Sequence, residues 1–140
     1  YIAWLDEKGY RNYNHILPHD VMVRELGTGK SRYELLTDAG LNIDVARKMP
    51  VDDGIQLVRA RLPNTWFKNI STVNKGLDCL RNYRRVYNEK LSVYQERPLH
   101  DWSSHAADAF RYLMIGLDTQ VNTRTDWNKP IDSAYKQQYL

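Results

Sequence analysis

Two aspartates stand where a carboxylate could hold a metal ion, and the first is Asp20. It follows residues 15–18, a short apolar segment closed by a proline, which predicts a buried strand. In open α/β sheets ligands bind at the carboxyl ends of strands, so a carboxylate at this point can face a metal. Aspartate also accepts backbone hydrogen bonds at helix starts, and position alone favours this capping role for Asp20.

The second candidate is Asp108, in a segment whose apolar spacing predicts a helix over residues 104–117. Asp108 lies on the side away from the apolar face, with His105 one turn before it and Arg111 one turn after it. This stripe combines an acid, a base and a cation. The alternative is a solvated helix face with an ion pair between Asp108 and Arg111, worth about 0.3 kcal/mol, and position alone favours it.

Residues 27–31, with the sequence GTGKS, look like the end of a phosphate-binding P-loop. That motif needs a glycine at position 24, where this chain has Arg24, and no clear strand runs into the loop. We therefore predict a flexible turn whose backbone amides and Lys30 could touch a phosphate, with a plain surface loop as the alternative.

A histidine-aspartate doublet occurs twice, at residues 19–20 and 100–101. Some all-helical metal phosphohydrolases use such a doublet, placed on helices. Pro18 and Pro98 precede the doublets here and disfavour helix immediately before them, so we set this interpretation aside.

Basic residues gather between positions 81 and 97, where they outnumber the acidic Glu89 and Glu96 and alternate with tyrosines. Lys and Arg neutralise DNA phosphates and release counterions, so this segment could follow a DNA backbone. A solvated helix face is an equally good interpretation. The basic residues are Arg81, Arg84, Arg85, Lys90 and Arg97.

Short strands and helices alternate along the chain, which predicts an α/β domain whose sheet is at least partly parallel. Two strands are convincing, whereas a stable sheet normally has three or more, so we expect part of the sheet to lie upstream of Tyr1. Helices are expected over residues 2–8, 32–39, 51–62, 73–87 and 104–117, a turn of helix at 21–26, and strands over 15–18, 41–46 and 91–94.

The composition fits one compact domain, because the chain has 140 residues and 42% of them are apolar. A net charge of +3 permits nucleic-acid binding without requiring it. Cys79 is the only cysteine, which excludes an internal disulfide and thiolate-rich zinc sites; we interpret it as a small core residue. No apolar run approaches the ~20 residues that span a bilayer, so we expect a soluble, intracellular protein.

Three segments together closely resemble the C-terminal part of the large terminase subunits of tailed phages. The third segment is the most specific, and in order and spacing the resemblance covers roughly residues 1 to 117. The segments are HILPHD at residues 15–20, RELGTGKSR at 24–32 and RPLHDWSSHAADAFRY at 97–112.

This resemblance implies an RNase H-like fold of the retroviral-integrase type, here as an N-terminally truncated mixed sheet flanked by helices. In that family three acidic residues hold two divalent metals, Mg²⁺ or Mn²⁺, which activate water and stabilise the leaving oxygen of a DNA phosphodiester. By the matching motifs, Asp20 corresponds to the second acidic ligand and Asp108 to the third. His105 would orient a ligand or contact phosphate. The resemblance thus favours the metal role for both aspartates over the capping and solvated-face alternatives.

The first acidic ligand is expected to come from outside this chain, because the family places it on the first strand of the sheet. Asp6 cannot replace it, since Asp20 comes only 14 positions after Asp6, which is too short a distance for the intervening hairpin and helix. The ATPase motor that precedes the nuclease in the family is absent as well. With two of three ligands, we expect the chain alone to be a weak or inactive nuclease.

The sequence thus predicts a metal-dependent endonuclease module that cuts concatemeric phage DNA during head filling in the cytoplasm of the bacterial host. Residues 1–120 would form the nuclease portion and residues 121–140 a polar C-terminal tail. Expected partners are double-stranded DNA, the terminase ATPase domain, the portal protein and the small terminase subunit, with no membrane involved. The alternative is a non-catalytic DNA- or portal-binding module, with Lys30, Arg81, Arg84 and Arg85 as the candidate DNA contacts in either case.

Overall fold

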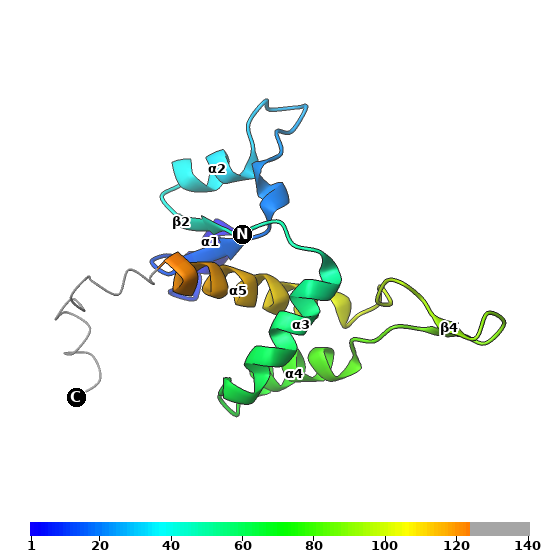
Figure 1. The fold of residues 1–140 in the computed structure, drawn as a ribbon. Helices are drawn as coiled ribbons and strands as arrows, with labels where there is room; N and C mark the ends of the chain where they lie inside the picture. Colours follow the sequence, from blue (N-terminus) through cyan, green and yellow to red (C-terminus); the bar gives the residue numbers. More distant parts are fainter. Residues whose placement is uncertain (124–140) are drawn as a thin grey trace.

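A computed structural model of the chain describes residues 1–123, with side chains through residue 119. These residues form a mixed α/β structure of five α-helices, two 3-10 helices and two small sheets (Figure 1). In chain order the elements are α1 (Ile2–Glu7), β1 (Asn14–Leu17), η1 (His19–Met22), α2 (Arg32–Asp38), β2 (Asn42–Val45), α3 (Val51–Arg61), η2 (Leu62–Asn64), α4 (Ser71–Asn82), β3 (Tyr87–Asn88), β4 (Val93–Tyr94) and α5 (Ser104–Thr123).

β1 and β2 pair in parallel, as the sequence predicted, and the chain returns from one to the other through η1 and α2. The register runs from the pair Asn14 and Asn42 to the pair Leu17 and Val45. α2 begins at a capping box: the Ser31 hydroxyl accepts from the Glu34 amide at 3.1 Å, and the Glu34 carboxylate accepts from the Ser31 amide at 2.7 Å. This helix start therefore needs no tertiary contact to be specified.

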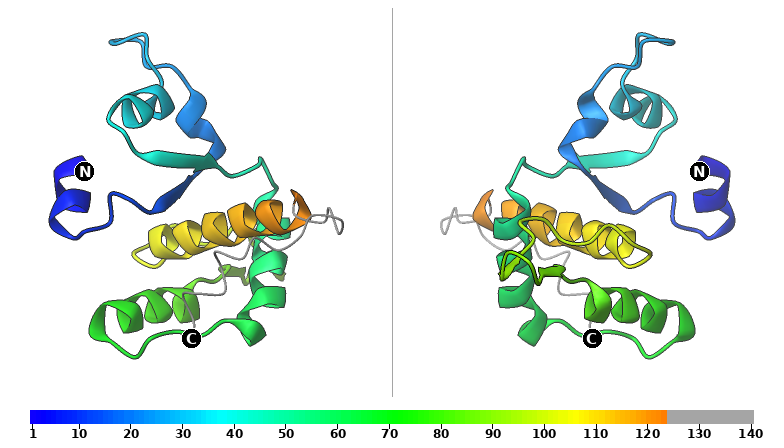
Figure 2. Two further views of the ribbon diagram at one scale, coloured as in Figure 1. Left: turned by 90° about the vertical axis from the view of Figure 1, so that its left-hand side faces the viewer. Right: turned by 90° about the vertical axis from the view of Figure 1, so that its right-hand side faces the viewer.

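α5 is the central element, with β1, β2 and α2 on one side and α3 and α4 on the other (Figures 1 and 2). Ile115, on α5, is fully buried. A Cβ atom at Gly116 would lie 2.6 Å from Cγ2 of Ile16 on β1, so the absence of a side chain lets the strand and the helix touch. Gly54 plays the same part in α3, where a Cβ would lie 2.8 Å from Cδ of Arg111.

A hairpin of β3 and β4 extends away from the body of the molecule (Figure 1). Tyr87 and Tyr94 face each other across it, with ring centroids 5.1 Å apart. The predicted helix over residues 73–87 was therefore wrong in its last part, because α4 ends at Asn82 and Tyr87 begins a strand. The strand expected at residues 91–94 is confirmed only at Val93–Tyr94.

The prediction of an α/β domain with parallel pairing is confirmed, but the described residues do not form one mixed sheet. Their parallel pair and their antiparallel pair lie in separate two-stranded sheets. The last helix is longer than expected and continues to Thr123 instead of ending near residue 117. Most of the predicted tail, from residue 124 onward, lies outside the described residues.

Gly116→Ala should lower the free energy of unfolding by about 1 kcal/mol. The reason is that overpacking against the stiff, β-branched Ile16 costs roughly 1–3 kcal/mol, whereas the better helix propensity of alanine returns only roughly 0.5–1 kcal/mol. Urea denaturation followed by circular dichroism measures the difference.

The matched control is Gly76→Ala in α4, where a Cβ would meet no atom within 4 Å. This variant should gain about 0.5–1 kcal/mol from helix propensity alone. Shifts of the same sign in both variants would show that the contact between Gly116 and Ile16 does not constrain the fold.

Candidate functional site

Asp20 lies in η1, directly after β1 and at its carboxyl end. The N-cap residue of η1 is Pro18, and no side chain caps this helix. Asp20 therefore does not have the capping role that its position suggested. The Asp20 side chain is exposed and makes no hydrogen bond or ion pair within the described residues. Its carboxylate is thus accessible to a ligand at the edge where the strand ends.

His19 places a second potential ligand atom next to Asp20. Its Nδ1 atom is buried and has no hydrogen-bond partner in the described part of the chain. Imidazole nitrogen is a common metal ligand, so the chemistry of this neighbour suits a metal site. The sequence pattern gave no reason to single out His19 beyond the doublet with Asp20, because burial of one ring nitrogen depends on tertiary packing.

Asp108 lies in the second turn of α5 and is held by two other side chains. Its Oδ1 atom accepts from Arg111 Nη2 at 2.9 Å and Nε at 3.3 Å, and from the Tyr83 hydroxyl at 3.3 Å. The ion pair considered from the sequence is therefore present, but it does not lie on a solvated face. Arg111 is buried, and only the Asp108 side chain, 39% exposed, reaches solvent.

The burial of Arg111 follows from the fold. Gly54 lets α3 approach the aliphatic stem of Arg111. The Arg111 guanidinium lies 4.6 Å from the ring centroid of Tyr112. A buried guanidinium needs a carboxylate partner, since removing the partner of a buried ion pair leaves an uncompensated charge. Asp108 is thus oriented by Arg111 and Tyr83 with its Oδ2 atom outside these hydrogen bonds.

The two aspartates do not form a complete metal centre within the described residues. No group of three His, Cys, Asp or Glu side chains there is placed to hold a metal ion. β1 meets α5 at Gly116, which lies eight residues, or about 12 Å of helix axis, beyond Asp108.

His105 does not bond to Asp108 in this structure. It is exposed, and its ring meets the ring of His100 edge to face at a centroid distance of 5.1 Å. The second doublet instead organises the start of α5: Asp101 accepts from the Ser103 hydroxyl at 2.6 Å and from the Ser103 amide at 2.9 Å. These bonds hold the pKa of the Asp101 carboxyl below its usual range.

The four predicted DNA-contacting residues do not lie on one surface. Lys30 bonds Asp38 at 2.8 Å near α2, whereas Arg81 bonds Asp78 at 2.9 Å on α4, at the opposite end of the molecule (Figures 1 and 2). Arg84 and Arg85 follow α4 and do share a site. The basic residues therefore lie at three places: Lys30 paired with Asp38, Arg81 paired with Asp78, and the adjacent Arg84 and Arg85.

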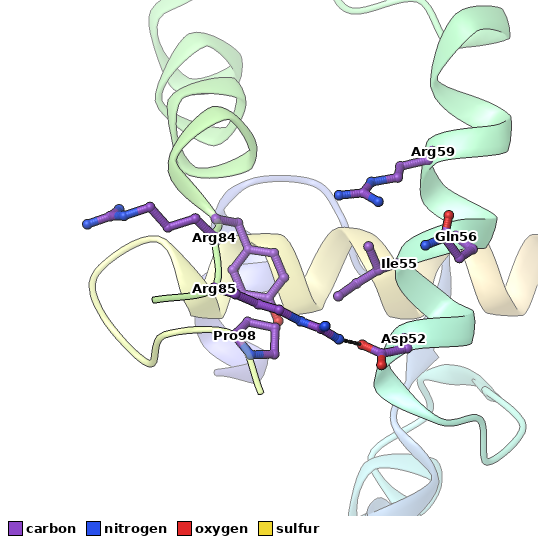
Figure 3. A pocket seen from close by; sticks show the side chains of 8 residues that line it. Asp52, Ile55, Gln56, Arg59, Arg84, Arg85 and Pro98 are labelled. Atoms are coloured by element: carbon purple, nitrogen blue, oxygen red, sulfur yellow. Dashed lines mark hydrogen bonds and ion pairs between the residues drawn. The ribbon is translucent and has the colours of Figure 1, made fainter. Parts of the chain in front are cut away.

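Arg84 and Arg85 border a pocket of about 290 Å³ between α3 and the segment that follows α4 (Figure 3). Sequence reasoning missed the α3 side of this pocket, whose polar residues are Asp52, Gln56 and Arg59. Positions i, i+4 and i+7 share one face of a helix, so the spacing of these polar residues was a usable signal. Tyr83 lines the same pocket, and its hydroxyl connects the pocket wall to Asp108.

No family model, curated protein or solved structure matches this chain. The likeness to terminases therefore remains a prediction that rests on the three sequence segments.

The Tyr83 phenol should ionise above its usual pKa of roughly 10, because burial and then the charge of Asp108 disfavour the phenolate. Because the pKa of Tyr83 is higher in the folded than in the unfolded chain, its contribution to the free energy of unfolding is complete below the unfolded pKa. This contribution is lost as the pH rises through the folded pKa. NMR titration of ¹³Cζ-labelled tyrosine, with Tyr83→Phe assigning the signal, measures this value.

Asp108→Asn should lower the Tyr83 pKa toward its usual value while burial keeps it from reaching that value. The matched control is Asp78→Asn on α4, which should leave the Tyr83 titration unchanged. An unaltered Tyr83 pKa in Asp108→Asn would mean that the two side chains do not interact in solution.

Proposed function

We propose that this chain is the C-terminal portion of a metal-dependent DNA endonuclease module, of the RNase H type found in phage terminases. One arrangement carries the proposal: Asp20 follows a parallel strand in the short helix η1, and its carboxylate is exposed and without a partner in the described residues. α5 packs on that strand and bears Asp108. Two carboxylates on a strand end and on the helix that covers the strand suit two-metal phosphodiester hydrolysis.

The residues present fit a divalent metal in chemistry, although not yet in number. Carboxylate oxygens are the ligands that Mg²⁺ and Mn²⁺ prefer, and Asp20 and the Oδ2 atom of Asp108 would supply them. When bound, such metals activate water and stabilise the leaving oxygen. Arg111 and Tyr83 would act on Asp108 by fixing the direction of its carboxylate, the usual contribution of residues behind a metal ligand.

A third carboxylate would reach this site on a further strand. β1 pairs with β2 along one edge, and no strand within residues 1–123 pairs with its other edge. Parallel sheets are normally larger and covered on both faces, so a strand added at this edge of β1 would complete the sheet beside Asp20. We propose that the first acidic ligand lies on that strand.

The proposed partners follow from this role: double-stranded DNA as substrate, the terminase ATPase domain, and the portal protein and small terminase subunit during packaging in the bacterial cytoplasm. Among the helices of the described residues, none is both long and apolar enough to cross a membrane.

A non-catalytic DNA- or portal-binding module is the second candidate. Its support is that Asp108 already has a cationic partner, and that the described residues hold no group of three metal-ligating side chains. In this case Asp108 would stabilise the buried Arg111, and the arginine pocket would serve binding alone.

A plasmid-nicking assay tests the endonuclease proposal. The chain alone should cut weakly or not at all, whereas the chain extended by the coding sequence upstream of Tyr1 should nick DNA in Mg²⁺ or Mn²⁺ and stop in chelator. In the extended protein, Asp20→Asn or Asp108→Asn should reduce the nicking rate by roughly 100-fold or more, since a metal ligand supports several kcal/mol of transition-state stabilisation.

Asp78→Asn is the control, because Asp78 is an exposed, paired carboxylate on α4 and should be dispensable for cutting. Equal metal-dependent nicking by Asp108→Asn and the unaltered extended protein would refute the assignment. Absence of nicking by the extended protein, together with salt-dependent DNA binding that survives both substitutions, would favour the binding module.

A further inference from the structure

The pocket beside Tyr83 has a chemistry of its own that the two aspartates do not explain. We propose that this pocket binds a phosphate group, which replaces Asp52 as the partner of Arg85. Binding of this kind requires neither a metal nor cleavage, so it does not depend on the endonuclease proposal. Three arginine side chains border the pocket, and their directions are clear in Figure 3.

Arg59 and Arg85 enter the pocket from opposite walls. Arg59 points into the hollow from α3, and Arg85 spans it from the segment after α4 and ends on the Asp52 carboxylate (Figure 3). The third arginine contributes only its stem, since the Arg84 guanidinium is directed outward and donates to the Asn82 carbonyl at 3.0 Å. The pocket therefore offers two guanidinium groups to whatever enters it.

Arg59 has donors to spare. It makes no hydrogen bond or ion pair within the residues whose side chains the structure describes. A guanidinium carries five N–H donors in a planar fork that matches phosphate oxygens, and it stays charged at every physiological pH. Gln56, one helical turn from both Asp52 and Arg59, adds an amide donor at the same opening.

Asp52 occupies the place of an anion. Its ion pair with Arg85 joins side chains that are 57% and 38% exposed, so the pair is weak and easily exchanged. Asp52 also lies in the first turn of α3, where the helix dipole favours a negative charge even without Arg85. A phosphate, with its larger set of charged oxygens, can bond Arg59 and Arg85 together, whereas Asp52 bonds Arg85 alone.

The same chemistry could come from two sources, a phosphodiester in a polynucleotide backbone or a small phosphate such as a mononucleotide. Both present anionic oxygens to a guanidinium fork. A competition experiment distinguishes them, because only a pocket that accepts a backbone phosphodiester lets a DNA duplex compete with inorganic phosphate for these arginines.

The first measurement uses inorganic phosphate and the side-chain Nε–H NMR signals of Arg59 and Arg85, with chloride at equal ionic strength as the blank. Phosphate should shift both signals saturably. Arg59→Gln should weaken binding roughly tenfold, the value of a lost hydrogen bond between charged groups. Asp52→Asn should tighten it about two- to fivefold, because the competitor for Arg85 is removed.

The matched controls are Arg81→Gln and Asp78→Asn, which alter an exposed ion pair on α4 outside the pocket by the same charges. They should leave phosphate affinity within a factor of about two. If phosphate does not shift the Arg59 and Arg85 signals of the unaltered chain, the proposal is overturned. Tightening by Asp78→Asn as large as that by Asp52→Asn overturns it too, because the effect would then come from net charge.

A short fluorescein-labelled DNA duplex then identifies the source. If the duplex displaces inorganic phosphate from the two arginine signals, the pocket takes a backbone phosphate of DNA. If the duplex leaves those signals unchanged while phosphate and adenosine monophosphate shift them, the pocket takes a small phosphate. Both outcomes support the phosphate site, and neither requires that the chain cut DNA.

Discussion

At Gly54 and Gly116 neighbouring side chains come so close to the backbones of α3 and α5 that a Cβ atom would lie within 3 Å of them. Packing of this kind leaves little freedom, because protein interiors are filled to near crystal density and a methyl group cannot be absorbed without displacement. The contact at Gly116 sets the depth of β1 on α5. The contact at Gly54 sets the position of Arg111, and through it the orientation of Asp108.

The local signals in the sequence determined most element boundaries well. The Ser31 and Glu34 capping box, the proline after β1 and the turn glycines Gly9 and Gly40, both with positive φ, act within a few residues and therefore appear in the sequence itself. The end of α4 could not be read in this way. Helical spacing continues to Tyr87, but the chain leaves the helix at Tyr83, whose hydroxyl donates to Asp108, 25 positions later in the sequence.

In the candidate site, too, the features set by local sequence could be predicted and those set by tertiary contacts could not. Asp20 and Asp108 were found because each lies at a position whose chemistry depends on one strand end or one helix face. The burial of Arg111 could not be predicted, because it depends on Gly54, which lies 57 positions earlier in the chain. Arg59 and Gln56 share a helical face with Asp52, but their basic partner across the pocket, Arg85, follows a different helix, and only the tertiary fold brings the two sides together.

The touch between Ile16 and Gly116 joins residues 100 positions apart, the difference between their numbers. Contacts of such long range are closed late, since the loop between them must first lose its entropy. During synthesis β1 can pair with β2 but lacks its contact with α5 until α5 has been made. Completion of α5 is therefore a condition for packing Ile16 against Gly116.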